Sequence, residues 1–199
     1  MRFLVVSLGN QEPYFNCLHS AGHHALAAAQ KLLAPSQPPF ASEKYGKKRC
    51  KVSSGLPYTF VQSPTMMNIS GHFVLAALKE TAARHQLQPS ELALVVVHDE
   101  LEAPLGDVQV RKWERSHRGH NGVKSALLTL REYLQVSQRH WRRISVGIGR
   151  PAARTPDVVS DYVLRKMTSH EINTISNKAG PSLVRCLGEL QDRWRDDHE

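Results

Sequence analysis

Short apolar runs and longer amphipathic stretches alternate along this chain. Phe3 to Leu8 is almost continuously apolar, and Glu91 to His98 is the clearest run of this kind. Such runs, when turn residues bound them, are typical of strands that are buried on both faces of a sheet covered by helices. Ser20 to Leu33 and Asn68 to His85 instead carry apolar residues at helical spacing. The alternation predicts an α/β fold with a mostly parallel sheet.

Further strands are predicted on both sides of the second apolar run. Arg49 to Ser54 and Tyr58 to Gln62 are separated by a Ser-Gly-Leu-Pro turn, which favours a hairpin. Asp107 to Trp113 alternates in polarity as a strand does, and Arg142 to Ile148 is the last strand-like segment. Asn121 opens a predicted helix that runs to Tyr133. These strands complete a twisted mixed sheet between two helical layers.

The C-terminal part of the chain has helical patterning only. It extends from His170 to Trp194, with Ser169 as the expected N-cap and a break near Gly180-Pro181. We find no internal repeat and no linker-like composition. The sequence therefore predicts a single three-layer domain over residues 1–199, with a C-terminal helical layer.

Composition narrows the partners and the compartment. Lys and Arg number 26 against 18 acidic residues, giving a formal charge of +8 and a pI of about 9.6. This balance favours a polyanionic partner, with a solvated basic surface as the alternative. The three cysteines are isolated and odd in number, so we expect no disulfide framework, no cysteine-based zinc site and a reducing compartment.

Targeting signals are not apparent in the sequence. No apolar run approaches the roughly 20 residues of a membrane helix, and Met1 leads within two residues into a strand-like segment. We therefore expect a soluble, intracellular protein without a cleavable presequence, in the cytosol or the mitochondrion, and no membrane partner.

Five polar residues stand at predicted strand ends or loops, far apart in the sequence. They are Asn10, His19, Asn68, Asp99 and Asn121. Together they offer a general base, a carboxylate to orient it, and uncharged amides that both donate and accept hydrogen bonds, a set that suits attack of water on an ester. Taken singly, each has a structural alternative, because His, Asp and Asn in these places also cap helices or form turns.

Motifs around these residues carry a resemblance to a known family. Segments that match it in order are 7–10, 17–22, 65–71, 98–101, 119–122 and 147–151, including an intact His-Asp-Glu-Leu and Gly-His-Asn-Gly. The chain resembles bacterial-type peptidyl-tRNA hydrolases, and their fungal members most. The resemblance spans nearly the whole length.

The resemblance implies the roles of the polar residues. His19 activates water, and Asp99 hydrogen-bonds the imidazole, holds its tautomer and raises its basicity. Asn10, Asn68 and Asn121 bind the peptidyl ester and the 3′-terminal nucleotide. The first of these amides helps to distinguish a blocked from a free amino group.

The resemblance also implies contacts with tRNA. Tyr14 and Met66 align with positions that line the pocket for the tRNA end, with Met66 in place of the usual Phe. Lys112 and Arg143 align with phosphate-binding residues. Other basic residues of the same loops could meet acceptor-stem phosphates; they are Arg111, Arg115, Arg118, Arg142 and Arg150. A solvated charged face is the alternative for Arg111 and Arg115.

The implied function is hydrolysis of the ester between a peptide, or an N-blocked amino acid, and the 3′-terminal ribose of tRNA. The expected protein is a monomer that uses neither a metal nor another cofactor and does not bind DNA. One rival is a zinc hydrolase using His23-His24 or His117-x-x-His120, although neither pattern supplies three fixed ligands. Another is a non-catalytic RNA-binding module of the same fold. A purine-nucleoside-type phosphorylase is suggested by fold analogy alone.

Overall fold

One seven-stranded sheet forms the centre of the protein. The computed structural model describes residues 2–133 and 140–196, and its strand order is β2-β3-β4-β1-β5-β7-β6. The four central strands, β4, β1, β5 and β7, are parallel, and β2, β3 and β6 pair antiparallel at the two sides. The strands are β1 (Arg2–Ser7), β2 (Ala41–Tyr45), β3 (Lys48–Ser54), β4 (Tyr58–Gln62), β5 (Leu92–Glu100), β6 (Val108–Lys112) and β7 (Trp141–Gly147).

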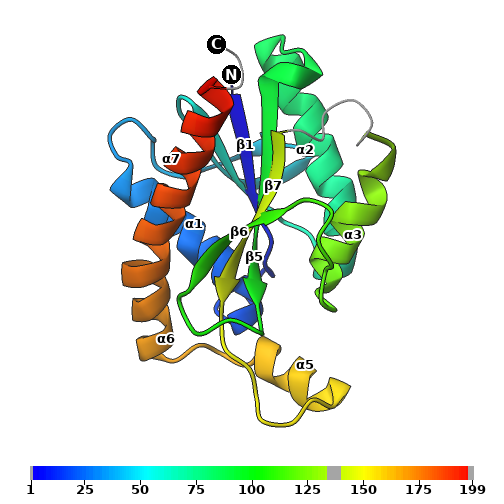
Figure 1. The fold of residues 1–199 in the computed structure, drawn as a ribbon, viewed down its shortest axis with the longest axis vertical. Helices are drawn as coiled ribbons and strands as arrows, with labels where there is room; N and C mark the ends of the chain where they lie inside the picture. Colours follow the sequence, from blue (N-terminus) through cyan, green and yellow to red (C-terminus); the bar gives the residue numbers. More distant parts are fainter. Residues whose placement is uncertain (1, 134–139, 197–199) are drawn as a thin grey trace.

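Helices cover both faces of the sheet (Figure 1). Helices α1 and α7 pack on one face, α2 and α3 pack on the other, and α5 lies beyond the carboxyl ends of the parallel strands. The helices are α1 (Ala21–Leu32), α2 (Ser70–His85), α3 (Asn121–Thr129), α5 (Pro156–Leu164), α6 (Ser169–Thr174) and α7 (Gly180–Asp196). The shorter helical segments are η1 (Leu18–Ser20), η2 (Met67–Ile69), η3 (Pro89–Glu91), η4 (Arg131–Tyr133) and the π-helical η6 (Ile175–Ala179).

The predicted fold class is confirmed, and the central strands form for the predicted reason. All nine residues of β5 are buried, and successive side chains enter opposite cores: Val95 and Val97 face α1, while Leu94 and Val96 face α2. Full burial of each such side chain contributes about 1.5–3 kcal/mol. The hairpin of β3 and β4 is confirmed as well. The carboxyl ends of β1, β4, β5 and β7 therefore lie together at one end of the sheet. We call this end of the strands, as distinct from the outermost strands, the catalytic edge.

Some elements differ from the prediction. Strand β2 was not predicted, because its sequence is mostly polar and exposed, and it is recruited as an edge strand by pairing with β3. Helix α5 was not predicted either. The N-cap of α6 is Thr168, in a capping box with Glu171, so the prediction of Ser169 was wrong.

The predicted break at Gly180-Pro181 was also wrong. The chain stays helical there, and η6 widens the helix by one residue just before Pro181. A proline cannot donate a backbone hydrogen bond and crowds the carbonyl four residues earlier, so the wider turn accommodates it without ending the helix. A Cβ at Gly180 would lie 2.7 Å from the Cβ of Ala28, which shows how closely α7 approaches α1.

Among the helices of the described residues, none has the length and apolar character required to cross a membrane.

Candidate active site

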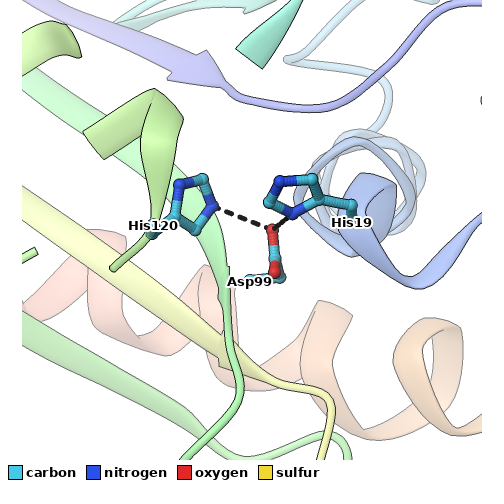
Figure 2. A group of neighbouring side chains, drawn as sticks. All are labelled: His19, Asp99 and His120. Atoms are coloured by element: carbon cyan, nitrogen blue, oxygen red, sulfur yellow. Dashed lines mark hydrogen bonds and ion pairs between the residues drawn. The ribbon is translucent and has the colours of Figure 1, made fainter. Parts of the chain in front are cut away.

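Two histidines share one carboxylate oxygen at the catalytic edge. Asp99, next to last in β5, is only 3% exposed. Its Oδ1 atom lies 2.9 Å from His19 Nδ1 and 2.9 Å from His120 Nε2. Figure 2 shows the two rings converging on this oxygen from opposite sides, His19 from the turn before α1 and His120 from the start of α3. Three segments that are distant in the sequence thus meet at one atom.

The hydrogen bonds define the tautomer of each ring. His120 is the N-cap of α3, and its Nδ1 accepts from the backbone N–H groups of Gly122 and Val123 at 3.1 and 3.2 Å. That nitrogen is therefore bare, and the proton is on Nε2, which donates to Asp99. A carboxylate only accepts, so His19 donates from Nδ1. In neutral His19, Nε2 then holds a lone pair that can take a proton from water.

The surroundings of His19 and Asp99 shift the pKa values of both side chains. Burial of His19 opposes its protonation, but the charge of Asp99 and the hydrogen bond to it outweigh burial and raise the pKa of the imidazole above its usual 6.5. Burial likewise works against ionisation of Asp99, but the two imidazoles, His19 foremost, hold the pKa of this carboxyl far below its usual range. Asp99 is therefore a constant anion, and His19 is a stronger base than a histidine in water.

His98 fills the space behind this cluster. Its Nδ1–H donates to the backbone oxygen of Asp99 at 2.7 Å, and its ring meets His120 edge-on at 5.1 Å. Burial, followed by repulsion from His120, lowers the pKa of His98 to about 3. His98 is therefore neutral at physiological pH and supports the rings in front of it without adding charge.

The turn after β1 positions Asn10. Its backbone N–H donates to Ser20 Oγ at 2.9 Å, and its side-chain nitrogen donates to Cys17 Sγ at 3.7 Å, which leaves the amide oxygen as an acceptor for a ligand. Gly9 allows this path, because a Cβ there would lie 2.4 Å from Cδ2 of His23. The thiol of Cys17 thus orients the side-chain amide of Asn10.

A cavity of about 710 Å³ lies in front of the cluster, within the range of small-molecule sites. It brings six of the nine predicted site residues together: Asn10, His19, Met66, Asn68, Asp99 and Asn121. Two basic residues, Arg118 and Arg154, also line it, and Val159, Val163 and Leu164 of α5 form an apolar wall. The cavity is thus polar at the cluster and apolar opposite it.

The two asparagines at the helix starts do not cap those helices. The N-cap of α2 is Ile69, without a side-chain hydrogen bond, and the N-cap of α3 is His120. Asn68 and Asn121 are exposed and line the cavity. The capping alternatives for these two amides are therefore wrong, and among the described residues neither side chain has a hydrogen-bond partner.

The cavity does not include Tyr14, Lys112 or Arg143. Tyr14 is 49% exposed in the loop between β1 and α1. Lys112 is exposed on β6, the outermost strand on its side of the sheet. Val108 of β6 and Asp99 of β5 both pair with Val146 of β7, so they lie at the same height in the sheet. Lys112 lies four residues further along β6. That separation corresponds to roughly 13 Å along the strands.

Arg143 corrects the expectation of a phosphate contact. It is 2% exposed, and its guanidinium donates to the backbone oxygens of Arg115 at 2.5 Å and Lys112 at 3.5 Å. Burial, with repulsion from Arg111, lowers its pKa to about 10. The side chain therefore supports the loop that leads to His120 and does not reach the surface. Arg118, which forms an ion pair with Glu100 at 3.6 Å, is the basic residue of this loop that faces the cavity.

The sequence analysis named His120 only as a possible zinc ligand and missed its hydrogen bond to Asp99. Its signal was its place directly before a helix, within the matched segment 119–122. Helix α5 was missed too, although Val158-Val159 and Val163-Leu164 recur at helical spacing after Pro156.

Three of the four histidines weighed as zinc ligands are engaged elsewhere. His23 pairs with Ser7 Oγ at 2.7 Å, His24 Nε2 lies 3.2 Å from the oxygen of Phe15, and His117 Nδ1 accepts from the N–H of Gly119. The described residues do group His19, Asp99 and His120, with ligand atoms within 4.8 Å of one another. Both histidines also hydrogen-bond to Asp99 Oδ1.

Comparisons with known proteins agree on one family. The family model described as peptidyl-tRNA hydrolase matches residues 4–193. A probable peptidyl-tRNA hydrolase of Schizosaccharomyces pombe is 38% identical over 133 residues, which are 67% of this chain and 61% of that protein. The peptidyl-tRNA hydrolase of a Sulfurihydrogenibium species is 33% identical over 171 residues, covering 84% and 79%.

The fold agrees as well. A crystal structure of a peptidyl-tRNA hydrolase variant from Acinetobacter baumannii superposes with a TM-score of 0.70 at 23% identity, covering 96% of this chain and 90% of that one. The family match, the relatives and the shared fold lead to one conclusion: the chain belongs to the peptidyl-tRNA hydrolase family.

Proposed function

We propose that this protein hydrolyses the ester between a peptide, or an N-blocked amino acid, and the 3′-terminal ribose of tRNA. The observation that carries the proposal is the hydrogen-bonded pair of His19 and Asp99 at the floor of a cavity lined by three neutral amides. Membership of the family supports the substrate class.

In this mechanism His19 acts as the general base. Its Nε2 takes a proton from water while the water oxygen attacks the ester carbon, and a tetrahedral intermediate forms. The intermediate collapses by breaking the bond to the ribose oxygen, which takes the proton back from the imidazolium. Asp99 stabilises the imidazolium during the interval, since its carboxylate accepts from Nδ1.

The amides bind the parts of the substrate that do not react. Asn10 offers its amide oxygen as an acceptor, and one N–H of its side chain donates to Cys17. Such an oxygen suits the N–H of a blocked amino group. Asn68 and Asn121 line the cavity with free donors and acceptors for the peptide or the terminal nucleotide. Because the amides are uncharged, they accept peptides of any sequence.

Two variants test this proposal on an N-acetyl-aminoacyl-tRNA. His19→Ala should lower kcat by roughly two or more orders of magnitude, as loss of a general base does, and leave tRNA affinity within a few-fold. Lys112→Ala should do the reverse, weakening affinity and leaving kcat unchanged. His170→Ala, at an exposed position on α6, is the matched control. Near-parental kcat in His19→Ala would exclude it as the base.

The assay also separates the proposal from its main alternative. A parent protein that binds N-acetyl-aminoacyl-tRNA without cleaving its ester would be an RNA-binding module of the same fold. The single domain over residues 1–199, the monomeric state, the lack of a DNA partner and the cytosolic or mitochondrial location stay predictions. Light scattering after size exclusion measures the oligomeric state.

A further inference from the structure

The hairpin of β2 and β3 projects past the catalytic edge of the sheet. Lys51 of β3 pairs with Gln62, the last residue of β4, so the part of β3 from Lys48 to Cys50 extends beyond the edge. This extension is roughly 10 Å long. A two-residue turn of Gly46 and Lys47, both with positive φ, closes the hairpin. The hairpin is on the opposite side of the sheet from β6.

Three basic side chains share one face of this hairpin. Lys44 lies directly opposite Arg49, and Lys51 follows two residues later on the same face. The other face, which includes Tyr45 and Cys50, is buried against α2. Like charges directly opposite each other destabilise a pair of strands. In the part of the chain that the structure describes, none of the three cations forms an ion pair, so no carboxylate is in direct contact with them.

A second cavity lies beside two of these cations, Arg49 and Lys51. It measures about 370 Å³ and is lined on one side by Arg49 and Lys51 and on the other by Asn10, Glu12 and Phe15. Asn10 also lines the catalytic cavity, so this residue is common to the linings of both cavities. Glu12 is the acidic residue that lines this second cavity, and among the described residues it forms no ion pair with Arg49 or Lys51. Arg49 and Lys51 therefore line the same cavity as one side chain of the proposed active site.

We propose that Lys44, Arg49 and Lys51 form a second phosphate-binding site for the sugar-phosphate backbone of tRNA. This inference rests on the proposed function, because it takes tRNA as the substrate. A phosphate partner is favoured over the peptide because every nucleotide supplies a fixed negative charge, whereas a peptide of arbitrary sequence does not. Bound phosphates would neutralise the like charges that face each other on β2 and β3.

The double variant Arg49→Gln/Lys51→Gln tests the site. Its dissociation constant for deacylated tRNA, measured by fluorescence anisotropy, should rise roughly tenfold at low salt. The slope of log K against log salt should become shallower by about 1.4 to 1.8, which corresponds to two lost phosphate contacts. KM for N-acetyl-aminoacyl-tRNA should rise equally with kcat unchanged. N-acetyl-aminoacyl-adenosine carries no phosphate, and its hydrolysis should be unaffected.

Matched variants control for charge and position. Lys48→Gln neutralises the neighbouring cation on the other face of the hairpin. Lys31→Gln/Arg193→Gln removes two exposed cations near the ends of α1 and α7, away from the catalytic edge. Both should keep the parental salt slope within about 0.3. A parental slope in the double variant, equal losses in the controls, or a loss confined to substrates with acidic peptides would overturn the proposal.

Stability provides a further check. Because the double variant removes repulsion, its thermal midpoint should equal or exceed the parental one. If it is lower, Lys44→Gln tests the same face with a single change. The two proposals also fail separately. If tRNA binding depends on the hairpin but the ester is not cleaved, the proposed hydrolase function is contradicted and the proposed phosphate-binding site is retained. If cleavage depends on His19 but the hairpin variant has the parental salt slope, only the phosphate-binding site is contradicted.

Discussion

His19 and His23 lie four residues apart, yet their surroundings shift the pKa of the two imidazoles in opposite directions. His19, in the turn before α1, donates to the carboxylate of Asp99, which overcomes burial and raises its pKa. His23, in the first turn of α1, has no carboxylate partner among the described residues and pairs through Nδ1 with the hydroxyl of Ser7. Burial, with repulsion from His24, outweighs a hydrogen bond to the backbone of Ser63 and lowers the pKa of His23 to about 3. Burial alone makes a neutral packing residue, and burial beside an anion makes a base.

The two regions also differ in what they hold in place. His19 lines the cavity, whereas His23 packs against Gly9 and so fixes the turn that carries Asn10. One region supplies the proposed chemistry, and the other supplies its geometry. Substitutions of Asp99, of its second hydrogen-bond donor His120, and of the buried His23 test this division.

Asp99→Asn should have the largest effect, because it removes the feature that separates the two histidines. We expect kcat to fall by roughly 10²- to 10⁴-fold, since the tautomer of His19 and the charge that stabilises its imidazolium are both lost. The pKa of His19 should fall, because burial is then unopposed, so the acid limb of the pH–rate profile should move to lower pH. An acid limb at the parental pH would contradict the role of Asp99.

His120→Ala should have a smaller effect and the opposite pH signature. The variant removes one of two donors on Asp99 Oδ1, so the carboxylate should act more strongly on His19 and move the acid limb to higher pH. We expect kcat to fall roughly tenfold, and stability to fall by about 1 kcal/mol through loss of the N-cap of α3. His120→Asn is the control, because Asn caps helices well but cannot reach Asp99 as the imidazole does. If it restored kcat along with stability, the hydrogen bond to Asp99 would have no role of its own.

His23→Asn should leave kcat within a few-fold and change how stability depends on pH. The unfolded chain protonates His23 near pH 6.5, while the folded protein resists protonation down to about pH 3. Its contribution is therefore complete above the unfolded pKa and is lost as the pH falls through this window, at no more than about 1.4 kcal/mol per pH unit. Urea denaturation between pH 6.5 and 4 should show a shallower loss in the variant than in the parent. Parallel curves would contradict the neutral, buried state of His23.

His98→Asn should flatten the same curve, because His98 is also buried with a pKa lowered to about 3. His19→Asn should not, because the pKa of His19 is raised. A raised pKa contributes stability that is present at low pH and is lost as the pH rises through the folded value. The sign of the change thus separates the two kinds of histidine without an activity assay.

Some parts of the fold could be predicted because their signal is local. Strands β1 and β5 are continuous apolar runs, and only a sheet covered on both faces buries such runs completely. Strand β2 has no such signal, since its polar sequence becomes a strand only when β3 offers a partner. The helix through Gly180-Pro181 depends in the same way on context, because packing of α7 on α1 stabilises a turn that local propensity disfavours.

The site shows the same division. Matched motifs pointed to His19, Asp99 and the three amides, and the structure brings all of them to one cavity. The same alignment suggested Arg143 as a phosphate contact, but the structure buries its guanidinium against backbone carbonyls. A motif specifies the residue type, whereas exposure depends on which loop folds over it.

The sequence by itself determined the family, the central strands and the identity of the residues in the proposed active site, because each has a signal within a few consecutive positions. Only the tertiary structure decided that His19 and His120 share one oxygen of Asp99, and that Lys44 faces Arg49 beside a cavity that reaches Asn10. Both arrangements depend on how strands and helices from distant parts of the chain are placed side by side, and such long-range packing leaves no local pattern in the sequence.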